Sequence, residues 1–241
     1  MHPDMKAIRC SIVRGGTSKG VYFLENDLPK DQALRDKVIR AAFGGVDIRQ
    51  IDGLGGADTL TSKVAIVGPS TREGCDVDYT FGQVSYTAPL VDYKGNCGNI
   101  SAGVGPFAID AGLVRAVEPV TTVRIHLTNT DNVIIAEVPV KDGRACTAGD
   151  FSIAGVPGTG SRITLDFSDT QGAQTGKLLP TGNAKDVFDF GDKGKFEVSL
   201  VDAGNPLVFI SAKSLGMTGI ETPAEIEANK PLMDTIEMIR G

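Results

Sequence analysis

Hydrophobic and polar residues alternate along several short segments of the chain. Within residues 76–87, Val77, Tyr79 and Phe81 stand between polar neighbours, and this period of two is typical of a half-buried β-strand. Short apolar segments predict further strands at residues 6–13, 20–24, 63–67, 121–128, 132–140, 151–167, 195–202 and 205–212. The polar residues 129–131 between two of these segments predict a hairpin turn.

Two segments follow the helical period instead. Residues 31–43 place Leu34, Val38 and Ala42 on one face, which is the pattern of a helix packed against a core. Residues 100–112 have small or apolar side chains on nearly every side, and a helix of this kind is enclosed by the rest of the protein. We therefore expect one surface helix and one central helix in the first half of the chain.

The C-terminal part adds a further helix. Residues 222–240 are expected to form one helix, because Thr222 and Glu225 have the spacing of a capping box. Residues 155–184 are rich in glycine and proline, which indicates a hinge between two parts of the chain. Many strands combined with few helices predict an α+β fold.

Composition narrows the range of partners and compartments. The chain of 241 residues has a formal net charge of −6 and no basic segment, so nucleic acid is not an expected partner. No segment approaches the ~18 consecutive apolar residues of a membrane span, so a membrane is not expected either. The four cysteines lie far apart, with no nearby histidine pair, which argues against a zinc site or a disulfide framework and favours the reducing cytoplasm.

Histidine is scarce, which restricts the possible chemistry. The chain contains only His2 and His126, and His126 alternates with apolar neighbours on a predicted strand, where a structural role is expected. A cysteine hydrolase needs a histidine partner for its nucleophile, so this class is disfavoured. Any catalysis is expected to rely on other acid–base groups.

The most informative motif surrounds Cys97. Residues 95–99 read Gly-Asn-Cys-Gly-Asn and stand directly before the predicted central helix. The first N–H groups of a helix lack internal partners and carry a partial positive charge, so they bind carboxylates and favour a thiolate. The motif predicts an acid–base thiol or an anion site. The alternative is a buried cysteine beside a glycine-rich cap, without chemical function.

Lys63 follows the glycine-rich segment 51–61 and begins an apolar strand. Desolvation at such a position favours the neutral amine, which can act as a general base. The glycine-rich segment lacks the third glycine of a dinucleotide-binding fingerprint. The alternative for Lys63 is a structural lysine that extends from the strand end to solvent.

Residues 14–20, with the sequence RGGTSKG, connect two predicted strands. Their backbone N–H groups and the hydroxyls of Thr17 and Ser18 suit an anionic ligand, but the GxxxxGK[ST] spacing of a phosphate-binding loop is absent. A solvent-exposed turn without function agrees equally well with this composition.

Taken together, these motifs resemble the 2-methylaconitate isomerase (PrpF-type) family, which includes 3-methylitaconate Δ-isomerases and 4-oxalomesaconate tautomerases. The resemblance extends over essentially the whole chain. It is carried by the segments RGGTSKG, IDGLGGADTLTSK, VDYTFGQV, YKGNCGNISAGVGPFAID, LLPTGN and VDAGNP.

The resemblance implies a diaminopimelate-epimerase-like fold, in which two similar halves each wrap a sheet around a central helix. It also implies an isomerase without cofactor or metal that performs a 1,3-allylic proton transfer, or a cis–trans isomerisation, on an unsaturated di- or tricarboxylate. The catalytic lysine and cysteine of the family match Lys63 and Cys97, and its substrate-contacting loop matches residues 17–19. Across the three motifs, the expected substrate-binding residues are Thr17, Ser18, Lys19, Ser62, Asn96, Gly98 and Asn99.

Two departures from the family keep other functions open. The chain is shorter than the family's members, so we expect residues 1–184 to form the first half and residues 185–241 to begin a second half that is incomplete. Diaminopimelate epimerases use one cysteine from each half, whereas only Cys97 lies in the expected frame here. The alternatives are an amino-acid racemase or epimerase, and an inactive fragment or non-catalytic binding protein of the same fold. A homo-oligomer is compatible with each.

Overall fold

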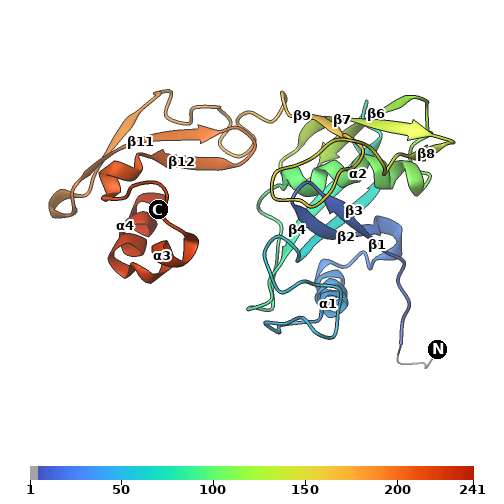
Figure 1. The fold of residues 1–241 in the computed structure, drawn as a ribbon, viewed down its shortest axis with the longest axis horizontal. Helices are drawn as coiled ribbons and strands as arrows, with labels where there is room; N and C mark the ends of the chain where they lie inside the picture. Colours follow the sequence, from blue (N-terminus) through green and yellow to red (C-terminus); the bar gives the residue numbers. More distant parts are fainter. Residues whose placement is uncertain (1–4) are drawn as a thin grey trace. The chain divides into compact units, whose positions relative to one another are not determined.

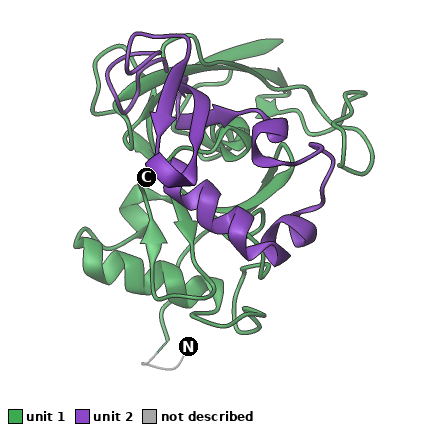
Figure 2. Cartoon of the chain, turned by 90° about the vertical axis from the view of Figure 1, so that its left-hand side faces the viewer, with its two compact units in different colours: residues 1–169 green, residues 170–241 purple. Residues whose placement is uncertain are grey.

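The computed structural model describes residues 5–241 (Figure 1). The chain divides into two compact units, residues 1–169 and residues 170–241 (Figure 2). This boundary falls within the glycine- and proline-rich segment in which a hinge is expected. The division into halves at residues 184 and 185 stays a prediction.

The first unit is built on one mixed sheet. In its described part, nine strands take part, in the order β1-β2-β3-β4-β6-β7-β8, with β5 added to β4 and β9 added to β7. Strand pairs β2–β3 and β4–β6 are parallel, and the remaining pairs are antiparallel. The strands are β1 Ser11–Gly15, β2 Ser18–Leu24, β3 Lys63–Pro69, β4 Val77–Val84, β5 Val91–Asp92, β6 Val120–Leu127, β7 Asn132–Lys141, β8 Arg144–Ala145 and β9 Thr164–Asp166.

Helix α2, Gly98–Asp110, lies inside the curve of this sheet (Figure 1). It contacts strands of both the β1–β4 and the β6–β8 parts of the sheet, so the predicted central helix is confirmed. Its glycines allow this close packing. A Cβ at Gly103 would lie 2.4 Å from the Tyr22 hydroxyl oxygen, and one at Gly105 would lie 2.7 Å from a methyl group of Val138, distances that packed atoms do not tolerate.

Helix α1, Gln32–Phe43, covers another part of the sheet, and its N-terminus is capped by the Asp31 side chain. The predicted element is confirmed, but its predicted apolar face is wrong at Leu34, which is 51% exposed. Ile39 and Phe43, one helical turn apart, are the fully buried residues instead, and they pack in a core that includes Val21. The buried stripe is therefore rotated by about one residue from the predicted one. A short 3-10 helix, η1 Glu25–Asp27, precedes α1.

Two predicted strands of the first unit are largely absent. Residues 6–10 are not in a strand, and β1 begins at Ser11. Of residues 151–167, only β9 pairs with β7, apart from a single bridge between Phe151 and Gly160. Gly155 and Gly158 both adopt left-handed backbone angles, with φ of 78° and 75°, and such angles interrupt an extended strand.

The second unit contains a small antiparallel sheet of three strands, with the order β10-β11-β12. Phe196, Val198 and Ile239 form its buried core. Its elements are β10 Asp186–Asp189, η2 Gly191–Lys193, β11 Lys195–Asp202, β12 Pro206–Ile210, η3 Ala212–Leu215, α3 Pro223–Ala228 and α4 Lys230–Arg240.

The C-terminal helix is interrupted, contrary to the prediction of one helix over residues 222–240. The capping box of Thr222 and Glu225 is present at the start of α3, as predicted. Asn229 then leaves the helical conformation, and its side chain caps α4 by accepting from the Leu232 N–H. Pro231 explains the break, because proline in a helix interior removes a backbone donor and clashes with the preceding turn. Among residues 5–241, none of the helices has the length and apolar character required to cross a membrane.

Candidate active site

The amine of Lys63 and the thiol of Cys97 meet in the first unit. Lys63 begins β3, and Cys97 is the residue directly before α2. The Lys63 Nζ donates to the Cys97 Sγ at 3.3 Å, and each residue is only 9% exposed. The ring of Phe81 lies below the amine, with its centroid 5.6 Å from Nζ. Two acid–base groups that are distant in sequence are thus adjacent in a largely dry environment.

The start of α2 provides anion-binding groups beside this pair. The N–H groups of its first turn, from Gly98 and Asn99, have no carbonyl of an earlier helical turn to bind. The Cys97 carbonyl is held by both the backbone N–H and the hydroxyl of Ser101, each at 2.9 Å. Within the described residues the Cys97 side chain makes no capping hydrogen bond, so its sulfur faces Lys63 rather than closing the helix end.

The turn between β1 and β2 packs directly on this helix start. The Asn99 amide donates to the hydroxyls of Thr17 at 2.9 Å and of Ser18 at 3.4 Å. A Cβ at Gly15 would lie 2.1 Å from the Asn99 carbonyl oxygen, which explains why this position has no side chain. The structure therefore brings together Thr17, Ser18 and Asn99, three of the residues expected to bind substrate.

Lys19 and Ser62 make other contacts. The Lys19 amine donates to the Leu54 carbonyl at 3.3 Å. The Ser62 hydroxyl is fully buried and donates to Gln50 Oε1 at 2.6 Å. Both side chains therefore fasten the glycine-rich segment that precedes Lys63. Their expected contact with substrate stays a prediction.

Gln50 is a residue of this region that the sequence did not reveal. It is 1% exposed, has a left-handed φ of 45°, and accepts from the Ala57 N–H as well as from Ser62. A single glutamine among polar and glycine residues predicts a surface loop, so no local pattern indicated its burial. Its role is visible only once the segment is folded over it.

Two tyrosines, Tyr22 and Tyr79, are fully buried in the same core cluster as Cys97. Burial, and to a smaller extent the neighbouring Cys97, raises the pKa of Tyr22 well above its ordinary value. Burial also raises the pKa of Tyr79 well above its ordinary value, and the neighbouring Tyr22 and Cys97 make smaller contributions in the same direction. Both phenols therefore stay neutral at physiological pH, and the Tyr22 hydroxyl donates to the Ile100 carbonyl in the first turn of α2.

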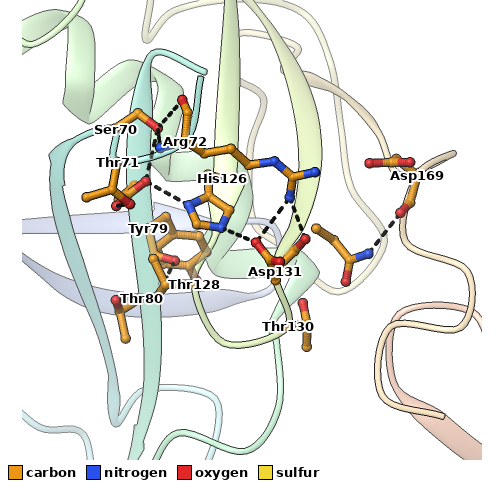
Figure 3. Close-up of polar contacts among 12 residues, drawn as sticks. Ser70, Thr71, Arg72, Tyr79, Thr80, His126, Thr128, Thr130, Asp131 and Asp169 are labelled. Atoms are coloured by element: carbon orange, nitrogen blue, oxygen red, sulfur yellow. Dashed lines mark hydrogen bonds and ion pairs between the residues drawn. The ribbon is translucent and has the colours of Figure 1, made fainter. Parts of the chain in front are cut away.

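His126 belongs to a polar cluster in which it contacts Asp78 and Asp131 rather than Lys63 or Cys97 (Figure 3). Its two ring nitrogens contact carboxylate oxygens of Asp78 at 2.8 Å and of Asp131 at 2.9 Å. Burial works against the charge of Asp78, but hydrogen bonds from Thr71, His126 and Ser70 outweigh it and lower the pKa of this carboxyl. These contacts agree with the predicted structural role of His126.

Asn96, also expected to bind substrate, points toward the hairpin between β6 and β7. Its amide donates to the Thr130 hydroxyl at 2.8 Å. The described residues contain no cluster of three or more His, Cys, Asp or Glu side chains placed to hold a metal ion. The groups that the structure brings together around Lys63 and Cys97 are one amine, one thiol and a set of N–H and hydroxyl donors.

Comparison with known proteins places the chain in a family. Residues 5–241 match the family described as PrpF protein. The chain belongs to the PrpF family. It is 59% identical over 238 residues to a 3-methylitaconate isomerase of Eubacterium barkeri. The aligned region covers 99% of this chain and 62% of that protein. It is also 49% identical over 233 residues to a 4-oxalomesaconate tautomerase of Pseudomonas putida. In this case the aligned region covers 97% of this chain and 63% of that protein.

Solved structures of similar proteins confirm the fold of this PrpF-family chain. A crystal structure of a methylitaconate Δ-isomerase superimposes with a TM-score of 0.78 at 60% identity, covering 97% of this chain and 60% of that one. A probable proline racemase of Agrobacterium radiobacter K84 superimposes with a TM-score of 0.53 at 14% identity, covering 95% of this chain and 60% of that one. This likeness concerns the fold alone. The predicted α+β, diaminopimelate-epimerase-like fold is confirmed. The chain spans about three fifths of the length of the curated relatives it matches.

Proposed function

We propose that the protein is an isomerase that moves a proton between two carbon atoms of an unsaturated di- or tricarboxylate. The observation that carries the proposal is the contact of Lys63 Nζ with Cys97 Sγ, 3.3 Å apart, at the N-terminus of α2. Family membership supports it, because relatives in this family are named for isomerisation of methylitaconate and oxalomesaconate. Methylitaconate, oxalomesaconate and methylaconitate types of substrate all have the required chemistry.

In the proposed reaction, neutral Lys63 accepts a proton from the carbon next to a carboxylate. The electron pair of the broken C–H bond enters the adjacent C=C system and gives a dienolate, whose charge spreads to the carboxylate oxygens. The low exposure of the amine and the covering ring of Phe81 limit access of water to this step. Positioned proton transfer of this kind typically accelerates a reaction by about 10²–10⁴-fold.

The anion formed in this step needs donors that are already in place. The N–H groups at Gly98 and Asn99 and the hydroxyls of Thr17 and Ser18 lie around the start of α2 and would stabilise it. Return of a proton to the distal carbon, from the Lys63 ammonium or from the Cys97 thiol, completes the allylic shift. When the thiol delivers the proton, the ammonium restores it across the 3.3 Å contact. A cis–trans exchange would require bond rotation in the dienolate before this return.

The proposal extends to the setting in which the protein acts. All four cysteines are free, and unpaired cysteines are typical of the reducing cytoplasm, where we place the activity. Association into a homo-oligomer is part of the same proposal and is tested by measuring the mass of the protein in solution.

The test is incorporation of solvent deuterium into methylitaconate, oxalomesaconate and methylaconitate, followed by NMR. The 241-residue chain is assayed beside the complete product of the encoding gene, should that product continue beyond Gly241. We expect Lys63→Ala to slow exchange by about 10²–10⁴-fold, and we expect Lys37→Ala, an exposed lysine on α1, to leave it unchanged. Exchange by Lys63→Ala at the rate of the parent would exclude the lysine as the base. Absence of turnover on all three compounds, in both chains, would favour a non-catalytic protein.

A further inference from the structure

The hairpin turn between β6 and β7 lies against the segment that leads to Cys97. Asn129, in this turn, donates to the Tyr93 carbonyl at 2.7 Å and to the Phe81 carbonyl at 2.9 Å, and it accepts from the Phe81 N–H at 2.8 Å. Phe81 is the residue whose ring lies below the Lys63 amine. One side chain thus joins the strand beside the amine to the start of the segment that carries the thiol.

The next residue of the turn holds the other end of that segment. The Thr130 hydroxyl accepts from the Asn96 amide at 2.8 Å, and Asn96 directly precedes Cys97. Asn129 and Thr130 therefore hold residues 93 and 96. These are the first and last residues of the short segment that connects β5 to Cys97. The bonds of Asn129 go to the backbone and replace a sheet ladder where strand pairing has ended, whereas the bond between Asn96 and Thr130 joins two side chains.

The turn itself is held from its far side (Figure 3). Parallel pairing of β4 with β6 ends at Tyr79 and Leu127, and the Thr128 N–H continues it by donating to the Tyr79 carbonyl at 3.0 Å. Asp131 is contacted by the His126 ring at 2.9 Å and by the Arg72 guanidinium at 3.2 Å. These bonds leave the turn little freedom to move relative to β4.

We propose that Asn129 and Thr130 are positioning residues that set the approach of the Cys97 thiol to the Lys63 amine. The effect on the position of the Cys97 thiol is inferred from these hydrogen bonds alone. The expected effect of that position on turnover rests on the proposed isomerase function. A shift of about 1 Å between reacting groups can change a rate by about 10²-fold. Hydrogen bonds that hold the 93–96 segment therefore act on catalysis without touching the substrate.

The decisive experiment compares Thr130→Val with Thr130→Ser in the 241-residue chain. Valine keeps the shape of threonine and removes the acceptor for Asn96, whereas serine retains the hydroxyl. Asn132→Ala is the matched control, because Asn132 belongs to the same hairpin but donates away from this segment, to the Asp169 carbonyl at 3.0 Å. Circular dichroism and thermal melting establish that each variant is folded.

Two readouts are measured for each variant. The first is the rate of Cys97 alkylation by iodoacetamide, resolved by peptide mass spectrometry with Cys10, Cys75 and Cys146 as internal references. The second is kcat and KM for deuterium exchange. For Thr130→Val we expect the alkylation rate of Cys97 alone to change several-fold and kcat to fall by about 10-fold with little change in KM. Thr130→Ser and Asn132→Ala should match the parent in both.

The two proposals fail in different ways. A parent-like Cys97 alkylation rate and kcat in folded Thr130→Val would overturn the positioning role, whatever Lys63→Ala does. A changed alkylation rate, together with absence of turnover in both this chain and the complete gene product, would support the positioning role and count against the isomerase proposal. Asn129→Asp gives a second test, because it keeps the acceptor for the Phe81 N–H and loses both donations. Parent-like thiol reactivity in that variant would also contradict the inference.

Discussion

The two units of the chain bury their apolar side chains to very different extents. In the first unit, α2 is enclosed by the sheet, and residues such as Ile100, Val104 and Ile125 are completely buried. In the second unit the buried cluster consists of three residues, while Val187 and Leu207 are 63% and 55% exposed. Every residue that we assign to the candidate site belongs to the first unit. The unit with the enclosed helix is thus also the unit that contains the candidate site.

The difference has a physical basis in what each sheet can cover. A sheet that curves around a helix buries one whole face, whereas three strands alone bury little apolar area. The second unit accordingly retains an apolar hollow of about 600 Å³, lined by residues that include Leu200, Leu207 and Ile239. A precise arrangement of amine and thiol requires rigid surroundings, and the first unit supplies them.

The largest effect is expected from a cavity beneath the site. Ile100→Ala removes a fully buried side chain from the first turn of α2, and substitutions of this kind destabilise by about 2–5 kcal/mol. Hydrogen exchange followed peptide by peptide should show faster opening throughout residues 5–169 and parent-like protection in residues 170–241. Equal loss of protection in both units would show that they unfold together and would remove the basis of the comparison.

An intermediate effect is expected from Asp202, the buried carboxylate of the second unit. Its Oδ2 accepts from the N–H groups of Gln174 and Thr175 at 2.8 Å and from the Thr175 hydroxyl at 2.9 Å. Burial opposes the charge, but these hydrogen bonds outweigh it and lower the pKa of Asp202. We expect Asp202→Asn to destabilise the second unit by about 1–3 kcal/mol at pH 7.

The same carboxylate predicts a pH dependence with a definite sign. Because the folded-state pKa lies below the ordinary value of 3.8, the stabilisation is present above that pH and disappears as the pH falls through the folded-state value. Denaturation of the parent and of Asp202→Asn between pH 7 and pH 2 should therefore converge at the acid end. Curves that stay parallel would show that the charge of Asp202 does not stabilise this unit.

The smallest effect is expected on the open face of the second unit. Leu207 is 55% exposed, and substitutions at exposed positions usually change stability by no more than about 0.5 kcal/mol. Leu207→Ser should therefore unfold at nearly the parent's denaturant concentration. A loss of stability several times larger would reveal that this face is covered in solution. The two units would then differ in what covers their apolar side chains, and not in how many of these side chains are buried.

The success of the sequence-based predictions depended on whether a signal was local. The hairpin of β6 and β7, the capping box at Thr222 and the enclosed helix were confirmed because turn residues, caps and apolar periodicity act within a few residues. The strand predicted over residues 151–167 and the uninterrupted helix over 222–240 were wrong. In the first, left-handed glycines prevailed over apolar composition, and in the second, Pro231 prevailed over helical periodicity.

The candidate site shows the same division. Lys63 and Cys97 were recognisable because each stands at the start of an element, beside glycines. Gln50 and Asn129 were not recognised, because their importance depends on bonds to residues between 7 and 48 positions away. Such bonds leave no pattern in a single sequence.

The amino-acid sequence by itself determined which segments form the central helix and the hairpin, and it singled out the amine and the thiol of the candidate site. These properties follow from side-chain periodicity, turn residues and the chemistry of individual groups. Only the tertiary structure decided that Lys63 Nζ and Cys97 Sγ lie 3.3 Å apart, and that Lys19 and Ser62 fasten a loop. Distances between remote residues result from how the sheet curves around α2, and that curvature is a property of all its strands together.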